Sequence, residues 1–231
     1  MKILALESSA VAASVCLCED EKLIAQSFEN SGLTHSVTLL PMAEEMLARC
    51  GVPLEAVDVI AVAAGPGSFT GLRIGVSAAK GLAWALDKPC AKVSTLEAMA
   101  WGMAICPGEL CPVMDARREQ VYNARFRSDG ERVTRLTPDR AISIAQLAEE
   151  LKESQILVGD GAGLCYNELS KLGLPVRLAP PNLRFQSAWG VARAALEQAR
   201  AGELITAGEL VPEYHRLSQA ERERLARMNE K

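Results

Sequence analysis

The sequence predicts an α/β fold of two lobes, in which each lobe is a mixed sheet flanked by helices. Two observations support this prediction. Strand-like segments at the N-terminus are followed by alternating helix and strand patterns, and a second such series begins near Pro107. With 231 residues, of which 49% are hydrophobic and 23% charged, the chain can bury a sizeable core.

The first half combines three opening strands with two helices and a buried strand. Short polar linkers separate the opening strands, which is typical of an antiparallel meander. A helix is expected over 36–50, where Gly51 and Pro53 end it. The apolar run at 58–65 is typical of a buried central strand, and a second helix is expected over about 72–86. The opening strands are expected at 2–6, 13–18 and 22–29.

This order of elements, βββαβα, is the repeat unit of the actin, hexokinase and Hsp70 fold, so we expect an actin-like ATPase fold (ASKHA, ribonuclease H-like). The second half reads as an eroded copy of the first. We expect a first lobe at 1–106, a second, reduced lobe at 107–207, and a C-terminal helix at about 208–231 that packs back on the first lobe. The second half is expected to contain strands at 111–116, 120–126 and 155–160 and helices at 143–153, 163–172 and 187–200.

Charge and cysteine usage limit the classes of function. A formal net charge of −4 argues against a protein that binds nucleic acid by itself, because contact with a phosphate backbone demands a basic face. Seven scattered cysteines without a C-x-x-C pair are typical of reduced, buried thiols. The opening residues soon turn polar, unlike a signal peptide, and no stretch approaches a membrane helix. We therefore expect a cytoplasmic protein without membrane contact.

The strongest local feature is the glycine-rich segment GPGSFTGLRIG at 65–75, between the buried strand and the second helix. Glycines permit close approach of another group, and exposed amides at a helix start can hold an anion. The segment is neither a P-loop nor a dinucleotide fingerprint. It is compatible with a phosphate-binding loop and equally with a structural tight turn. The candidate phosphate- or nucleotide-contacting residues are Gly65, Gly67, Ser68, Thr70 and Gly71.

Five segments together resemble the TsaB family, also known as YeaZ. The glycine-rich segment closely resembles the family's signature, and the matches span nearly the whole chain. Glu7 stands where many members carry Asp, and its greater length argues against a magnesium role. His215 replaces a Leu. The other four segments are ILALESS (3–9), HSVTLLP (35–41), MDARREQVY (114–122) and PEYHR (212–216), and the two hairpin segments among them add Glu7, Ser8, Ser9 and Asp115 to the phosphate-loop candidates.

The resemblance implies a non-catalytic partner, or activator, of a larger paralogue, TsaD. Their complex would form N6-threonylcarbamoyladenosine next to the anticodon of tRNAs reading codons that begin with A, and a small ATPase, TsaE, would join it. It also implies a homodimer when the chain is alone, tRNA contact only through the complex, and no cofactor required by this chain, with ATP and magnesium acting in the complex. Nucleotide binding by this chain, direct tRNA contact, dimer affinity and the identity of the two pairing surfaces stay open.

The residues themselves argue against catalysis by this chain. TsaD-like paralogues bind a metal through H-x-x-x-H, because histidines four apart share one helical face. Here the histidines are His35 and His215, and Leu39 stands four residues after His35, so we expect no metal site and no catalytic residue. His35 is instead expected at a helix start, between Thr34 and Ser36, which are good capping residues.

Asp115 and Asp160 support an enzymatic alternative. Both lie at expected strand ends beside the interlobe cleft, where carboxylates of an actin-like ATPase hold magnesium. Ordinary strand-end turns would also account for them. An ATP-binding enzyme of the ATPase or kinase type is therefore the alternative function, and a protease is a more distant one.

Two helices are expected to contact a partner. The apolar arc of the 36–50 helix is wider than packing on one sheet requires, and the 72–86 helix is rich in small residues. The alternative is that the two helices bury each other inside the lobe. The candidate interface residues are Leu39, Leu40, Ala43, Met46, Leu47, Gly75, Ala78, Ala79 and Leu82.

Overall fold

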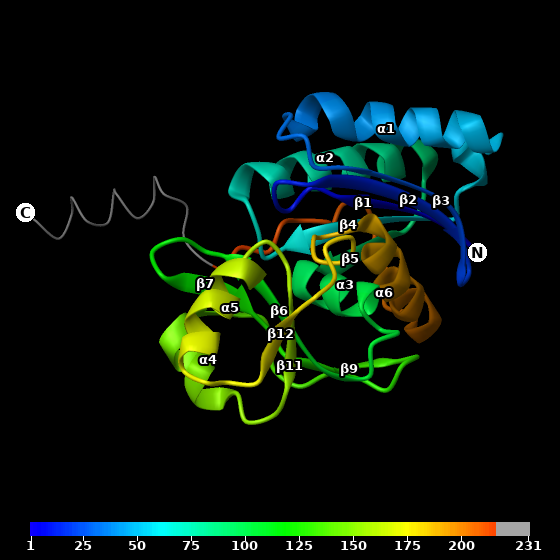
Figure 1. Ribbon diagram of the computed structural model, residues 1–231. Coiled ribbons are helices and arrows are strands. Elements are labelled where there is room, and N and C mark those ends of the chain that lie inside the picture. The colour runs from blue at the N-terminus through cyan, green and yellow to red at the C-terminus, as the bar shows by residue number, and fades with distance from the viewer. Residues whose placement is uncertain (216–231) are drawn as a thin grey trace, which may run out of the picture.

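The computed structural model describes residues 1–215 as two lobes, each built on one mixed sheet (Figure 1). The first sheet consists of β1 (Lys2–Glu7), β2 (Ala13–Glu19), β3 (Lys22–Glu29), β4 (Val59–Gly65) and β5 (Cys90–Ser94). Its strand order is β3-β2-β1-β4-β5, in which β1 to β3 form an antiparallel meander and β1, β4 and β5 run parallel. The predicted meander and the buried central strand are confirmed, since every residue of β4 is buried.

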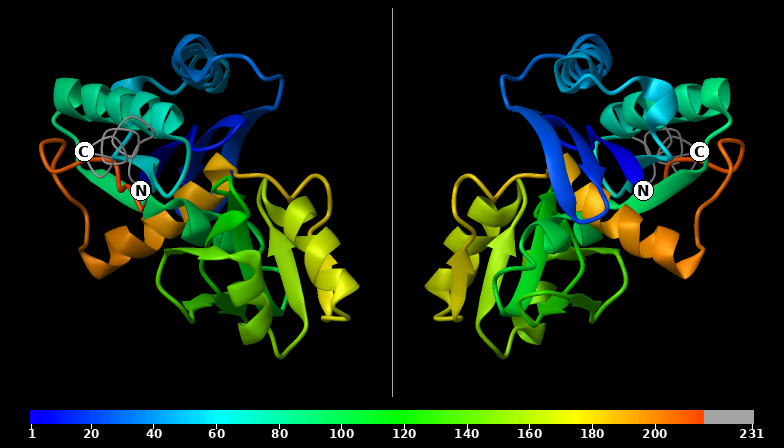
Figure 2. Two further views of the ribbon diagram at one scale, coloured as in Figure 1. Left: turned by 90° about the vertical axis from the view of Figure 1, so that its left-hand side faces the viewer. Right: turned by 90° about the vertical axis from the view of Figure 1, so that its right-hand side faces the viewer.

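Helices cover both faces of the first sheet. One face carries α1 (His35–Cys50) and α2 (Phe69–Leu86), and the other carries α3 (Thr95–Gly102) and α6 (Ala188–Ala201); a short 3-10 turn, η1 (Leu54–Ala56), leads into β4. Residues of β1 alternate between these layers, because successive strand side chains point to opposite faces. Ile3 and Ala5 contact the core beneath α6, and Leu4 and Leu6 the core beneath α1 and α2. Both views of Figure 2 show α6 beneath the first sheet.

The second sheet contains β6 (Gly108–Asp115), β7 (Gln120–Asn123), β8 (Phe126–Ser128), β9 (Val133–Arg135), β10 (Arg140–Ser143), β11 (Gln155–Val158) and β12 (Val176–Leu178). Its main order is β10-β7-β6-β11-β12, and β8 pairs with β6 and β9. Helices α4 (Ile144–Glu150) and α5 (Ala162–Lys171) cover one face, where Cys111 and Val113 of β6 point. Leu110 and Met114 point to the other face and share a core with α3.

The two sheets repeat one topology. β6 is antiparallel to β7 and parallel to β11, as β1 is antiparallel to β2 and parallel to β4, and β12 extends its sheet as β5 does. The helices α4, α5 and α6 follow their strands in the same positions as α1, α2 and α3. The strand order therefore supports the inferred duplication of one unit.

The last helix of each unit packs between the sheets. α3 and α6 contact each other closely, and α3 also contacts β6 while α6 contacts β1, β2, β4 and β5. The predicted second lobe, 107–207, includes α6. In the structure α6 packs on the first sheet. No described helix is long and apolar enough to span a membrane.

The chain after α6 returns to the first lobe. Ile205 forms a β-bridge with Cys90, and the Leu210 side chain is buried beside α2. The C-terminal helix expected at about 208–231 is not seen in residues 208–215, and its remaining residues lie outside the described part of the chain. All seven cysteines are free thiols, and five of them are buried, as expected.

Candidate functional site

The glycine-rich segment packs tightly against neighbouring backbone. A Cβ atom added at Gly65 would overlap a residue of the C-terminal segment, one at Gly67 would overlap Ser9, and one at Gly71 would overlap the carbonyl oxygen of Ser8. These positions require glycine because another stretch of backbone lies where a side chain would begin. The arrangement is that of a structural tight turn. This is one of the two interpretations that the sequence allowed; the other was a phosphate-binding loop.

The same contacts engage the polar groups of the segment. The Ser68 amide donates to the Ser9 carbonyl over 2.7 Å, and the Ser8 hydroxyl donates to the Gly71 carbonyl over 2.9 Å. The Ser68 hydroxyl accepts from the Gly71 amide over 3.3 Å and so caps α2. Because of this cap, α2 begins three residues earlier than predicted, and Thr70 and Gly71 belong to the helix.

A second turn of this kind occurs in the other lobe. Gly159 and Gly161 come just after β11, and Gly65, the last residue of β4, and Gly67 lie at the end of β4. Gly65 and Gly159 both have positive φ, 140° and 112°. A Cβ at Gly159 would overlap the carbonyl oxygen of Val113, in the neighbouring strand β6. The G-x-G turn is therefore a feature of the duplicated unit, set by strand-to-helix packing in both lobes.

Carboxylates from both lobes gather at the edge where the parallel strands end. Glu7 is the last residue of β1, Asp115 is the last of β6, and Asp160 follows β11. The Ser9 amide donates to Glu7 Oε1 over 2.6 Å, and Gln186 Nε2 donates to Asp160 Oδ1 over 2.7 Å. Ligands of α/β proteins commonly bind at such an edge. The structure thus brings the predicted residues of the two hairpins to one region.

Two carboxyl groups at this edge have raised pKa values. Burial raises the pKa of Glu7 to about 7; hydrogen bonds from Ser9 oppose the rise, and the charge of Asp160 adds to it. Burial also raises the pKa of Asp160, to which the charge of Asp115 adds. The amides of Ser68 and Gly71 in the glycine-rich turn are engaged in hydrogen bonds within the protein. Among residues 1–215, no three histidine, cysteine or acidic side chains are placed to hold a metal ion. A magnesium site built from three such ligands is therefore not assembled among these described residues.

The histidine and its neighbours have structural roles. His35 is the first residue of α1, as expected, and its Nε2 atom lies 2.7 Å from the carbonyl oxygen of Ala10 in the β1–β2 turn. Leu39, four residues on, is buried in the core. Thr34 occupies the N-cap position, but the expected capping bond is not formed by its side chain. The start of α1 is attached through the imidazole of His35 instead.

The predicted interface residues divide into two groups. Leu40 is 45% exposed, and Ala78 and Leu82 are half-buried, so these three reach the surface. The prediction of a partner surface is wrong for the other six, because α1 and α2 pack on the sheet and on each other and bury them. These six buried residues are Leu39, Ala43, Met46, Leu47, Gly75 and Ala79.

A C-terminal strap, defined here as residues 204–214, runs along the polar face of α2. Lys80 Nζ donates to two carbonyl oxygens of the strap over 3.1 and 3.3 Å, and Arg73 Nε donates to the Tyr214 hydroxyl over 3.0 Å. The Tyr214 ring stacks on Phe69 with centroids 4.5 Å apart. The sequence showed PEYHR only as a motif, and its contact with the glycine-rich segment was not foreseen because the two lie far apart in the chain.

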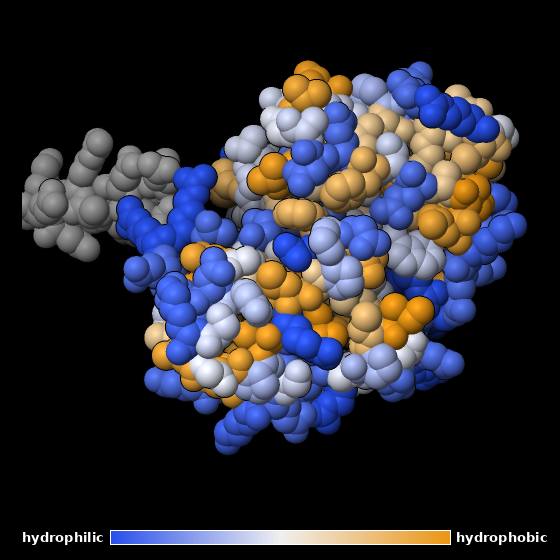
Figure 3. Space-filling view, in the orientation of Figure 1, coloured by the Kyte–Doolittle hydropathy of each residue, from blue (hydrophilic) through white to orange (hydrophobic). Residues whose placement is uncertain are grey.

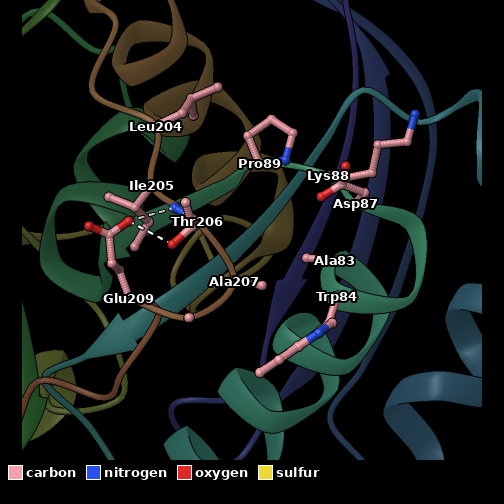
Figure 4. A pocket seen from close by; sticks show the side chains of 11 residues that line it. Ala83, Trp84, Asp87, Lys88, Pro89, Leu204, Ile205, Thr206, Ala207 and Glu209 are labelled. Atoms are coloured by element: carbon pink, nitrogen blue, oxygen red, sulfur yellow. Dashed lines mark hydrogen bonds between the residues drawn. The ribbon is translucent and has the colours of Figure 1, made fainter.

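A groove of about 430 Å³ lies between the end of α2 and the strap (Figure 4). Trp84, which is 69% exposed, and Asp87 line one side, and Thr206 lines the other, hydrogen-bonded to Glu209. None of the predicted phosphate-loop residues lines this groove.

Comparison with known proteins gives consistent matches. The family model described as TsaD, tRNA N6-adenosine threonylcarbamoyltransferase, matches residues 28–228. The tRNA threonylcarbamoyladenosine biosynthesis protein TsaB of Bacillus subtilis (strain 168) is 31% identical, over 96% of both chains. TsaB of Escherichia coli (strain K12) is 38% identical over 56% of both. The structure of YeaZ from Pseudomonas aeruginosa superposes with a TM-score of 0.79 at 29% identity, covering 92% of this chain and 99% of that one.

The duplicated sheets and interlobe helices define a two-lobed protein of the actin-like, ASKHA class. A component of an Acidaminococcus fermentans 2-hydroxyglutaryl-CoA dehydratase shares this fold alone, with a TM-score of 0.51 at 11% identity. The chain belongs to the TsaB, or YeaZ, family of tRNA threonylcarbamoyladenosine biosynthesis proteins. It therefore takes part in the biosynthesis of this tRNA modification.

Proposed function

We propose that this chain is the non-catalytic partner subunit of a TsaD-type threonylcarbamoyltransferase. The complex would form N6-threonylcarbamoyladenosine next to the anticodon of tRNAs that read codons beginning with A. The observation that carries this proposal is the replacement of the second metal-binding histidine of such enzymes by Leu39, which is buried in the core beneath α1. His35 alone cannot supply a two-histidine site, and its ring is engaged with Ala10.

An apolar surface supports the partner role. Figure 3 shows hydrophobic side chains gathered over the first turns of α1, bordered by hydrophilic ones. Leu33, Val37 and Leu40 are 58%, 67% and 45% exposed. Together with Ala78 and Leu82 of α2 we call them the α1–α2 face. Contiguous exposed apolar side chains commonly mark a protein–protein contact. This face would bind TsaD and, in its absence, a second copy of the chain.

The remaining parts of the proposal follow from this role. The chain would hold TsaD in its competent state in the cytoplasm, and TsaE would join the pair. ATP and magnesium would act in the complex, and tRNA would reach this chain only through it. The engagement of the Ser68 and Gly71 amides within the glycine-rich turn supports a chain that needs no nucleotide of its own.

Binding of purified TsaD, measured by calorimetry, tests the surface. Leu40→Glu should weaken binding at least about tenfold, because a charge would be buried without a partner. Leu172→Glu is the matched control, since Leu172 is 67% exposed at the end of α5 in the other lobe. Equal affinity of the Leu40→Glu variant and the unaltered chain would place the contact elsewhere.

A further inference from the structure

The groove at the C-terminal end of α2 lies on the side of the helix away from the α1–α2 face. Trp84 follows Leu82 by two residues, which places its side chain roughly 200° further round the helix. The strap covers this side, because Lys80, one helical turn before Trp84, donates to the carbonyl oxygens of Gly208 and Leu210. The groove is therefore a surface separate from the face proposed to bind TsaD.

The groove carries negative charge. Asp87 and Glu209 are among its lining residues, and neither carboxylate forms an ion pair within the described part of the chain. The nearby ammonium groups are engaged by backbone carbonyl oxygens, that of Lys80 by the strap and that of Lys88 by Glu55 over 3.0 Å. The C-terminal end of α2 adds partial negative charge, as helix ends of this kind do. The groove therefore attracts cations.

Asp87 is an unfavourable residue for its position in the helix. It is the C-cap of α2, with a φ of 51° and a ψ of 47°, in the left-handed region that favours glycine. Its charge also opposes the helix dipole, and the last turn of α2 contains no basic residue that would offset it. A carboxylate placed there at a cost in local stability favours a role in contact with another molecule.

The walls of the groove suit a side chain that has an apolar stem and a planar cationic end. Trp84 is 69% exposed, so most of its indole is open to a ligand (Figure 4). Pro89, Leu204 and Ile205 form apolar walls. An arginine guanidinium stacks on indole and pairs with carboxylates, and its methylene stem packs on apolar side chains. A lysine ammonium is compact and strongly hydrated, so it gains less from such a site.

We propose that this groove binds an arginine side chain presented by a segment of another protein. The guanidinium would stack on Trp84 and pair with Asp87 and Glu209, and its stem would lie against Pro89 and Ile205. The volume of about 430 Å³ lies within the range of ligand sites in proteins, roughly 300 to 1,000 Å³. Because the groove and the α1–α2 face lie on different sides of α2, both can be occupied at once. This inference does not depend on the proposed function.

Nuclear magnetic resonance of the full chain tests the site with three short peptides of otherwise identical sequence, which carry arginine, lysine or citrulline at the centre. Citrulline has the shape of arginine without its charge. The indole N–H signal of Trp84, assigned by its loss in Trp84→Phe, should shift on titration with the arginine peptide, while those of Trp101 and Trp189 should not. The arginine peptide should bind about tenfold more tightly than the citrulline peptide, and also more tightly than the lysine peptide.

A variant of the groove identifies the contact. Asp87→Asn should weaken binding of the arginine peptide about threefold, because a charged partner is lost while asparagine remains acceptable in the left-handed region. The matched control Glu44→Gln removes a carboxylate from an exposed position of α1 and should leave binding unchanged.

Two results would overturn the proposal. One is equal binding of the arginine peptide and either of the other two, or no shift of the Trp84 signal with any peptide. The other is a Trp84 signal that moves with the concentration of the chain alone, which would show that a second copy fills the groove.

Discussion

The Ser8 hydroxyl donates a hydrogen bond of 2.9 Å to the carbonyl oxygen of Gly71, which joins the β1–β2 turn to the first turn of α2. The carbonyl oxygen of Ser8 lies where a Cβ of Gly71 would stand. Packing between two backbone segments thus explains the glycines of this segment. The resemblance of the segment to the family signature therefore indicates a shared fold before it indicates a shared function.

Gly71→Ala should destabilise the chain by about 1 to 3 kcal/mol, because the added methyl group meets backbone rather than a flexible side chain. The free energy of unfolding, measured by urea denaturation, checks this. Gly81→Ala on the same helix is the matched control: nothing lies within 4 Å of its Cβ, and it should stabilise the chain by about 0.5 to 1 kcal/mol. Equal stability of the two variants would contradict the packing account.

Glu7→Gln should change the pH dependence of stability. The native carboxyl titrates at about 7 and the unfolded one at 4.5, so the folded state holds a proton that the unfolded state has lost between these values. The stability contributed by neutral Glu7 is therefore lost as the pH rises from 4.5 through 7. Relative to pH 4, the variant should gain about 3 kcal/mol over the unaltered chain at pH 8.

Urea denaturation of both proteins across this pH range measures the difference. Parallel pH curves for Glu7→Gln and the unaltered chain would show that the Glu7 carboxyl titrates normally.

Gly190→Ala should weaken the packing of α6 on α3. A Cβ at Gly190 of α6 would overlap the carbonyl oxygen of Ala98 in α3, where the two interlobe helices touch. We expect a loss of about 1 to 3 kcal/mol in the free energy of unfolding. Gly163→Ala in α5, with nothing within 4 Å, is the control and should not destabilise the chain. A loss of similar size in both variants would mean that helix glycines are simply intolerant of change.

Comparison of Met46→Glu with Leu40→Glu should distinguish a core position of α1 from a surface position. Met46 lies on the buried side of α1 and is 6% exposed, so a carboxylate there should lower the free energy of unfolding by about 3 kcal/mol or more. Leu40 lies on the same helix at 45% exposure, and its substitution should change stability by less than about 0.5 kcal/mol. Thermal unfolding of both variants checks this, and a stable Met46→Glu protein would show that α1 is not packed as described.

Patterns of local sequence predicted much of this structure. The continuous apolar runs of β1, β2 and β4 and the periodicity of α1, α2 and α6 were sufficient to place these elements. β5 and α3 were not predicted, because they are short and almost wholly buried, and a short apolar run does not distinguish strand from helix. The candidate site was predicted only in part. Glu7 and Asp115 were found through their hairpins, whereas Gln186 and the contact of Tyr214 with Phe69 depend on long-range packing.

A reconstituted modification assay tests the central claim most directly. Purified TsaD, TsaE, ATP, threonylcarbamoyl-adenylate and substrate tRNA would be combined with this chain, without it, and with this chain in place of TsaD, and the nucleosides measured by mass spectrometry. We predict modified adenosine only when this chain and TsaD are both present. Equal product from TsaD without this chain would contradict the partner role, and product from this chain without TsaD would show that it is itself the enzyme.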